Sequence, residues 1–89
     1  MVERYQVTEE DIRAGLDRLE RELARRLSQN GFGIFVSTHE VLGVVQEEIH
    51  ELHDAVKSND NDAVAQECLD IAVGALFGYI SHHTGRMDW

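Results

Sequence analysis

Apolar residues recur at steps of three and four through most of the chain, which is the spacing of one face of an α-helix. In the first such stretch the apolar stripe consists of Ile12, Leu16, Leu19, Leu23 and Leu27. Thr8 precedes the stripe as a suitable N-cap, and Asn30-Gly31 follows it with residues that tolerate the left-handed conformation of a helix end. We therefore predict a first helix from about Glu9 to Ser28. Acid–base pairs four residues apart, such as Glu22/Arg26, are expected to form its exposed face.

Two further helices are predicted in the second half of the chain. Ser37, with Glu40 three residues later, has the spacing of a capping box and predicts a helix from Thr38 to about Lys57. The sequence SNDND at 58–62 predicts a turn that also caps a third helix, from about 62 to 82. The glycines of GFGIFV, residues 31–36, favour a loop there, whose aromatic residues either seal the core or stack on a base. Residues 83–89 are predicted to be a tail.

These patterns predict an all-α protein of one domain, residues 1–89, in which the second and third helices form an antiparallel hairpin. The third helix is apolar on nearly all sides: between Cys68 and Ile80 it carries a single charged residue, Asp70. A helix of this kind must be buried all round, and two neighbouring helices cover only part of it. We therefore expect the three-helix protomer to form a helical bundle as a homo-oligomer, a dimer or a tetramer.

Composition and charge narrow the class of partner. The 89 residues contain no proline and are 43% hydrophobic, which suits a folded helical domain. The formal charge of −9 disfavours nucleic-acid polymers and anionic membrane surfaces, whereas a small phosphate compound can bind if a divalent cation lies between it and the protein. The single cysteine and the absence of an N-terminal apolar run predict a cytoplasmic protein. The apolar stretch 71–80 is about half the length of a membrane span.

Two acidic pairs lie at matching spacing on either side of the predicted turn: Glu48/Glu51 and Glu67/Asp70. On the second helix the predicted core face consists of Leu42, Val45, Ile49, Leu52 and Val56, and Glu48 lies at its edge. Because an antiparallel hairpin brings positions equally distant from its turn to the same level, all four carboxylates are expected to converge. Acids on helices are commonly solvated surface residues, but one of these pairs belongs to a helix with almost no other charge.

Converging carboxylates repel one another unless a cation compensates them. Lys57, at the helix end, is the one lysine or arginine in the two helices, and Arg25 and Arg26 of the first helix are expected to be exposed. A divalent cation that prefers oxygen ligands is the natural compensation.

The segment EEIHEL, followed by HDAVKSNDNDAVAQ and ECLDIAV, resembles the E-x-x-E, spacer, E-x-x-D signature of MazG-like nucleotide pyrophosphohydrolases, of the all-α NTP pyrophosphatase superfamily. The resemblance covers residues 39–80, about half of the chain. It implies an enzyme that hydrolyses a nucleoside triphosphate to the monophosphate and pyrophosphate, with Mg²⁺, or Mn²⁺ in its place, as cofactor. It implies the metal ligands Glu48, Glu51, Glu67 and Asp70, and it agrees with an oligomer.

Roles in the reaction follow from this resemblance. Glu48, or the neighbouring Glu47, would take the proton of the attacking water, although Glu47 is expected on the surface. Cations for the triphosphate are few, and Lys57 and His39 are the candidates for substrate contact within the motif region.

Two other interpretations stay open. The chain could be a non-catalytic regulatory or scaffold module whose acids form a degenerate or structural cation site. Glu47 and His50 also have the E-x-x-H spacing of half a di-iron bundle site, but the third helix has no matching histidine near its acids.

Overall fold

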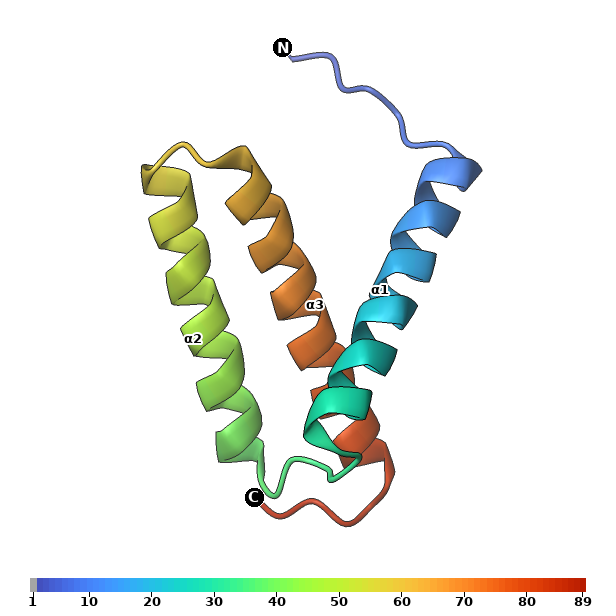
Figure 1. The fold of residues 1–89 in the computed structure, drawn as a ribbon, viewed down its shortest axis with the longest axis vertical. Helices are drawn as coiled ribbons and strands as arrows, with labels where there is room; N and C mark the ends of the chain where they lie inside the picture. Colours follow the sequence, from blue (N-terminus) through green and yellow to red (C-terminus); the bar gives the residue numbers. More distant parts are fainter. Residues whose placement is uncertain (1) are drawn as a thin grey trace.

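The computed structural model describes residues 2–89. They form three helices, α1 (Glu9–Asn30), α2 (Thr38–Lys57) and α3 (Asn61–His83), and within these residues no strand, only an isolated bridge between Ser37 and Asp88. Helices α2 and α3 lie side by side and run in opposite directions (Figure 1). The predicted all-α class and the antiparallel hairpin are therefore confirmed, and each helix boundary lies within two residues of its expected position.

The helix starts are fixed by side-chain caps. Thr8 and Asp11 form a full capping box on α1, in which each side chain accepts a hydrogen bond from the other residue's backbone N–H, at 2.9 and 3.1 Å. On α2, Ser37 Oγ accepts from the backbone N–H of Glu40, as the sequence predicts. The Glu40 carboxylate, however, accepts from the N–H of Val36 at 2.8 Å, so the second arm of the predicted box reaches one residue further back.

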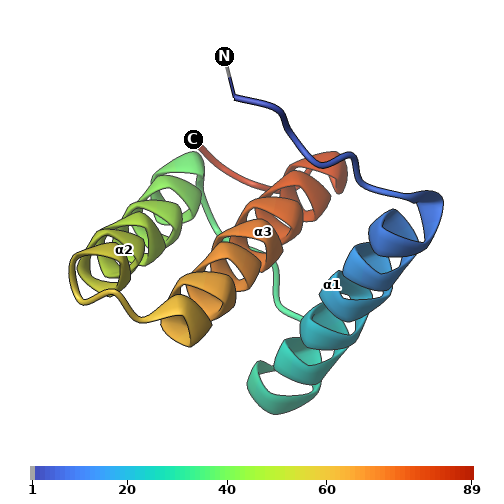
Figure 2. The same ribbon diagram turned by 90° about the horizontal axis from the view of Figure 1, so that it is seen from above.

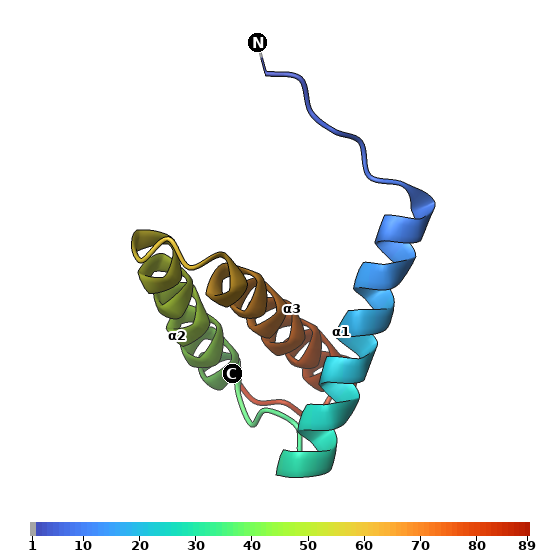
Figure 3. The same cartoon turned by 45° about the horizontal axis from the view of Figure 1, so that its top comes forward.

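Helix α3 lies between α2 and α1 (Figure 2). Its contact with α2 extends along the hairpin, whereas its contact with α1 is smaller. The N-terminal half of α1 diverges from the hairpin and projects away from it (Figure 3). Consequently Ile12 and Leu16, which belong to the predicted apolar stripe, are each about half exposed.

Small residues on α3 allow α2 to approach closely. A Cβ built on Gly78 would lie 2.8 Å from Cγ1 of Val41, and one built on Gly74 would lie 3.7 Å from Cγ1 of Val44. Ser81, one turn further on, is fully buried, and its hydroxyl accepts a hydrogen bond of 3.1 Å from the N–H of Phe35. This bond anchors the loop between α1 and α2 to α3.

Phe35 and Phe32 of that loop have different environments. The ring of Phe35 packs edge-on against Phe77 of α3, with 5.0 Å between the ring centroids, so it contacts the core as expected. Phe32 is exposed, so the same interpretation is wrong for Phe32.

The predicted core face of α2 is partly wrong. Leu42, Ile49 and Val56 are 55%, 41% and 58% exposed. Val45 and Leu52 of the predicted face are half-buried, as expected. Val41 and Val44 also face the glycines of α3, Ala55 is buried, and Glu48 lies on the same side of the helix. Gly78 and Gly74 of α3 face Val41 and Val44, so the side of α2 that carries these valines packs against α3.

The C-terminal segment, residues 84–89, returns to the start of α2 (Figure 1). The N–H of Asp88 donates to the carbonyl oxygen of Val36 at 2.8 Å, and the N–H of Thr38 donates to the carbonyl oxygen of Asp88 at 3.0 Å. The segment predicted as a tail is thus hydrogen-bonded to the cap region of α2.

Within the single chain α3 is not buried on all sides. Tyr79 is 70% exposed, and Cys68 is exposed as well. Among the described residues α3 is also the one helix whose length and composition would allow it to cross a membrane, although a core helix of a soluble protein has the same features. A protein partner would cover α3 and the apolar stripes of α1 and α2 together.

We propose that a second copy of the chain covers the exposed apolar side chains of the protomer. These are Ile12 and Leu16 on α1, Leu42, Ile49 and Val56 on α2, and Tyr79 on α3. Sedimentation velocity at micromolar concentration is expected to show an oligomer. Replacing Ile49 with Glu places a charge in the uncovered stripe of α2 and should shift the protein toward the monomer. A folded wild-type monomer at that concentration would contradict the proposal.

The close contact at Gly78 makes a second prediction. Gly78→Ala introduces a methyl group 2.8 Å from Val41 and should lower the free energy of unfolding by about 1–3 kcal/mol, the usual cost of overpacking. Gly43→Ala is the matched control on α2, since open space surrounds a Cβ there. Alanine favours a helix interior over glycine by up to about 1 kcal/mol, so the control should be as stable as wild type or more stable. Equal stability of the two variants in urea unfolding would argue against the contact.

Candidate metal centre

Three of the four predicted acids come together where α2 faces α3. Glu48 from α2 and Glu67 and Asp70 from α3 each offer a carboxylate oxygen, and these oxygens lie within 4.8 Å of one another. All three residues are half-buried. Glu51, one turn along α2, is exposed and lies outside this group, but its charge acts on both Glu48 and Glu67. We call Glu48, Glu67 and Asp70 the carboxylate group.

Two oxygens of the carboxylate group are buried without any partner. Oε2 of Glu48 and Oε2 of Glu67 are inaccessible to solvent and accept no hydrogen bond from the described residues. A buried polar atom without a partner costs free energy, and for a carboxylate the cost is larger than for a neutral group. These two oxygens therefore favour the uptake of a proton or a cation.

Burial is the main reason why the pKa of Glu48 is raised to about 7. The neighbouring Glu67 carboxyl and the negative charges of Glu51 and Asp70 raise it further. The pKa of Glu67 is also raised, again mainly by burial, although the neighbouring Glu48 carboxyl opposes the shift. In the metal-free protein, burial therefore favours the protonated form of both carboxyl groups.

Asp70 has a protein cation beside it, which the sequence reasoning did not anticipate. Arg26 of α1 forms an ion pair with Oδ1 of Asp70, and the Gln66 side chain donates to the same oxygen at 2.9 Å. The expectation that Arg26 is exposed is therefore wrong: its side chain is 28% exposed and lies against α3. Arg25, whose side chain is 52% exposed, fits the expectation.

Glu22 holds these arginines in place. It is 2% exposed, and its carboxylate accepts hydrogen bonds from the guanidinium groups of Arg18, Arg25 and Arg26. These bonds, that of Arg25 above all, lower the pKa of Glu22 to about 2. The sequence interpretation of Glu22/Arg26 as an exposed pair was wrong, because three arginines at positions three and four residues away allow this carboxylate to be buried. The spacing of these arginines is the feature of the sequence that could have predicted a buried Glu22.

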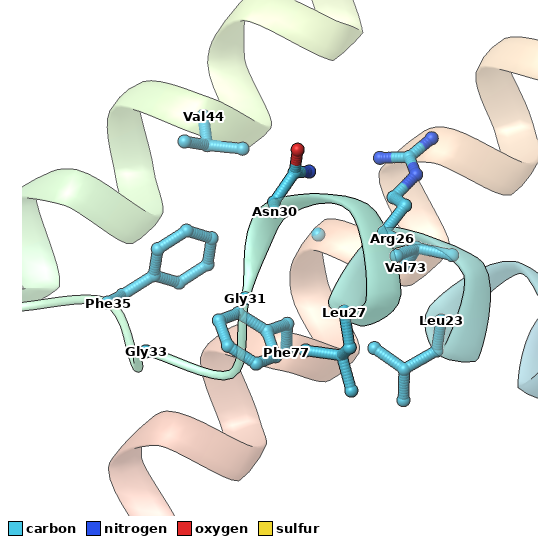
Figure 4. Close-up of a pocket in the computed structure, with 11 residues that line it drawn as sticks. Leu23, Arg26, Leu27, Asn30, Gly31, Gly33, Phe35, Val44, Val73 and Phe77 are labelled. Carbon is cyan, nitrogen blue, oxygen red and sulfur yellow. The ribbon is translucent and has the colours of Figure 1, made fainter.

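An apolar cavity of about 260 Å³ lies on the other side of Arg26. Figure 4 shows it between the C-terminal end of α1, the following loop, and the facing sides of α2 and α3. Phe35 and Phe77 line it together with Leu27, and Asn30 adds an amide. Arg26 belongs to both places, since it lines the cavity and binds a member of the carboxylate group.

The other predicted site residues lie outside the carboxylate group. His39 and Lys57 are exposed and occupy opposite ends of α2, so their roles in substrate contact stay predictions. Glu47 is exposed, as expected. His50 is also exposed, and its Nε2 lies 3.9 Å from Oδ2 of Asp54 rather than beside the acids, which does not favour a di-iron site.

The donor set suits a hard divalent cation. It consists of carboxylate oxygens only, and Mg²⁺ and Mn²⁺ prefer such ligands, whereas Zn²⁺ is more often held by histidine and cysteine. A positive charge would be stabilised most next to the buried, unpartnered oxygens of Glu48 and Glu67.

The raised pKa of Glu48 makes the stability of the metal-free protein depend on pH. Its pKa is about 7 in the folded protein and 4.5 in the unfolded chain, so between these values the folded protein binds more protons. The free energy of unfolding should therefore fall as the pH rises from 4.5 to 7. Glu22 does not oppose this trend, because the stability that it contributes is lost only as the pH falls below 4.5.

Urea unfolding in the presence of a chelator measures this dependence. Glu48→Gln removes the titrating group and should flatten the profile, whereas Glu47→Gln should leave the wild-type slope. A wild-type free energy of unfolding that rises through this range and is unaffected by Glu48→Gln would contradict the assignment.

Comparison with protein families gives one match. The model of the phosphoribosyl-ATP pyrophosphohydrolase family matches residues 16–82, a range that contains Glu22, Arg26 and the whole carboxylate group. No curated protein and no solved structure matched the chain. The match supports a relationship to nucleotide pyrophosphohydrolases in general and does not specifically support the MazG-like branch. On the strength of a match over most of its length, the chain belongs to the phosphoribosyl-ATP pyrophosphohydrolase family.

Proposed function

We propose that this protein is a Mg²⁺-dependent pyrophosphohydrolase that cleaves the α–β phosphoanhydride bond of a nucleoside triphosphate or of a nucleotide built on one. The products are the corresponding monophosphate and pyrophosphate. Family membership supports the coarser statement, hydrolysis of a phosphoric anhydride in a nucleotide-like substrate. The observation that carries the finer one is the carboxylate group, with ligand oxygens within 4.8 Å of one another and two buried oxygens that lack partners.

Glu48, Glu67 and Asp70 would hold the cation, with Glu51 at the exposed edge able to complete the set. When bound, Mg²⁺ offsets the charge of the triphosphate and polarises the phosphoryl group and a water molecule. The three acids would hold the cation, and with it the reacting phosphate, between α2 and α3. Their net negative charge would repel a bare triphosphate, which is why substrate binding should require the cation.

Glu48 is the residue best suited to take the proton of the attacking water. A carboxylate can bind the cation through one oxygen and accept a proton on the other, and Glu48 is the one member of the carboxylate group on α2. In the reaction the water oxygen forms a bond to the α-phosphorus, the bond from that phosphorus to the bridging oxygen breaks, and pyrophosphate leaves. The water proton passes to Glu48.

The cavity beside Arg26 supports a nucleotide rather than a simpler anhydride as substrate. It is apolar, it contains the edge-on pair Phe35 and Phe77, and the Asn30 amide can recognise polar base atoms. We infer that the base enters this cavity while the phosphates reach the carboxylate group. The family name specifies phosphoribosyl-ATP, whereas the acidic motif resembles that of enzymes acting on nucleoside triphosphates, and both substrates contain the same scissile bond.

A substrate panel tests the proposal. Purified protein with millimolar Mg²⁺ should release pyrophosphate from at least one of phosphoribosyl-ATP, ATP and the other canonical or modified (d)NTPs. Glu67→Gln removes a ligand charge and should lower the rate by orders of magnitude, because the reaction depends on the cation that it helps to hold. The same variant should lose most of the rise in melting temperature that Mg²⁺ gives the wild type.

Glu47→Gln is the matched control, since Glu47 is exposed and outside the carboxylate group. Its rate and its response to Mg²⁺ should equal those of the wild type. A wild-type protein stabilised by Mg²⁺ that releases no pyrophosphate from any substrate would favour the non-catalytic module with a structural cation site.

A further inference from the structure

The two oxygens of Asp70 have different surroundings. Oδ1 accepts from two donors, the guanidinium of Arg26 on α1 and the amide of Gln66, one turn earlier on α3. Oδ2 takes part in neither bond. A carboxylate held through one oxygen cannot rotate freely, so its second oxygen has a defined direction.

Arg26 is itself held by a buried group. Its Nε donates to Oε2 of Glu22 at 3.2 Å, while another nitrogen of the same guanidinium binds Asp70. Glu22 is 2% exposed and has the lowered pKa of a carboxylate with several cationic donors, so it stays charged at neutral pH. A planar guanidinium with donors on several edges can bind two carboxylates at once, which the ammonium of lysine does less precisely.

From these contacts we infer that Arg26, anchored by Glu22, is a positioning residue that fixes the Asp70 carboxylate with Oδ2 available for the cation. The inference rests on the proposed function, because it assumes that the carboxylate group binds Mg²⁺. It gives α1 a function in the centre although the ligands belong to α2 and α3. Hydrogen bonds to metal-ligating carboxylates commonly change metal affinity by about 10- to 100-fold when they are removed.

Charge repulsion alone predicts the opposite change in Mg²⁺ affinity. Arg26 carries a positive charge next to the site, so its removal would strengthen cation binding if charge repulsion dominated. Arg25 separates the two effects, because it donates to the same Glu22 and its charge also acts on Asp70, yet its hydrogen bonds go to Glu22 and Gln29 rather than to Asp70. Neutralising Arg25 therefore removes a similar charge without removing the hydrogen bond.

The experiment is calorimetric titration of the nucleotide-free protein with Mg²⁺, and with Mn²⁺ as a second probe. Arg26→Gln is expected to weaken binding by about 10- to 100-fold. Arg26→Lys should recover part of the affinity, since it keeps a charged donor, and Arg25→Gln should bind the ion at least as tightly as wild type. In pyrophosphate-release assays, the Mg²⁺ concentration that gives the half-maximal rate should rise for Arg26→Gln by a similar factor.

Unchanged or tighter Mg²⁺ binding by Arg26→Gln would overturn the inference. So would an increase in KM for nucleotide with unaltered ion affinity, which would indicate that Arg26 binds phosphate instead. If circular dichroism shows that Arg26→Gln is unfolded, Arg26→Lys is titrated instead. Wild-type Mg²⁺ affinity in Arg26→Lys would show that a guanidinium contacting both Glu22 and Asp70 is not needed. Glu67→Gln distinguishes the positioning role from the proposed function. If Glu67→Gln loses Mg²⁺ binding while Arg26→Gln binds Mg²⁺ like the wild type, the positioning role is refuted and the metal site is retained.

Discussion

Where α2 meets α3, the short distance between their backbones forces carboxylates from both helices into one poorly solvated place. Gly78 and Gly74 permit this approach, since a side chain at Gly78 would collide with Val41. Glu48 lies on the same side of α2 as Val41 and Ala55, so packing this side against α3 also brings Glu48 toward Glu67 and Asp70. The packing free energy of the hairpin therefore maintains an arrangement of charges that is unfavourable in itself.

Two groups of the chain compensate part of that unfavourable arrangement. A proton on Glu48 removes one charge, as the pKa of about 7 indicates, and Arg26 neutralises Asp70 from α1. The buried oxygens of Glu48 and Glu67 still have no partner, and the divalent cation that we propose would reach all three acids together. A site that is destabilised when empty binds its ligand more favourably, because binding relieves the repulsion.

The sequence predicted the parts of this centre that depend on helical periodicity. Spacings of three residues and a short turn are sufficient to bring Glu48 level with Glu67 and Asp70, and the caps locate the helix ends. The errors have a common origin, since they concern relative helix rotation and contacts between distant segments. Leu42, Ile49 and Val56 satisfy the apolar period, but the glycines of α3 select the neighbouring side of α2. The Arg26–Asp70 pair joins residues 44 positions apart, which no local pattern encodes.

Helix α1 connects the centre to the uncovered surface of the protomer. Its C-terminal half supplies Arg26 and the buried Glu22, while Ile12 and Leu16 in its N-terminal half contact no other helix closely enough to be buried. The contact between α1 and α3 thus combines the charged pair Arg26–Asp70 with Leu23 and Leu27, which are half-buried. Such a contact is sensitive to the charge state of the carboxylate group. A second copy of the chain that covers the apolar half of α1 would also hold Arg26 in place, so that the proposed assembly would be linked to the geometry of the carboxylate group through α1.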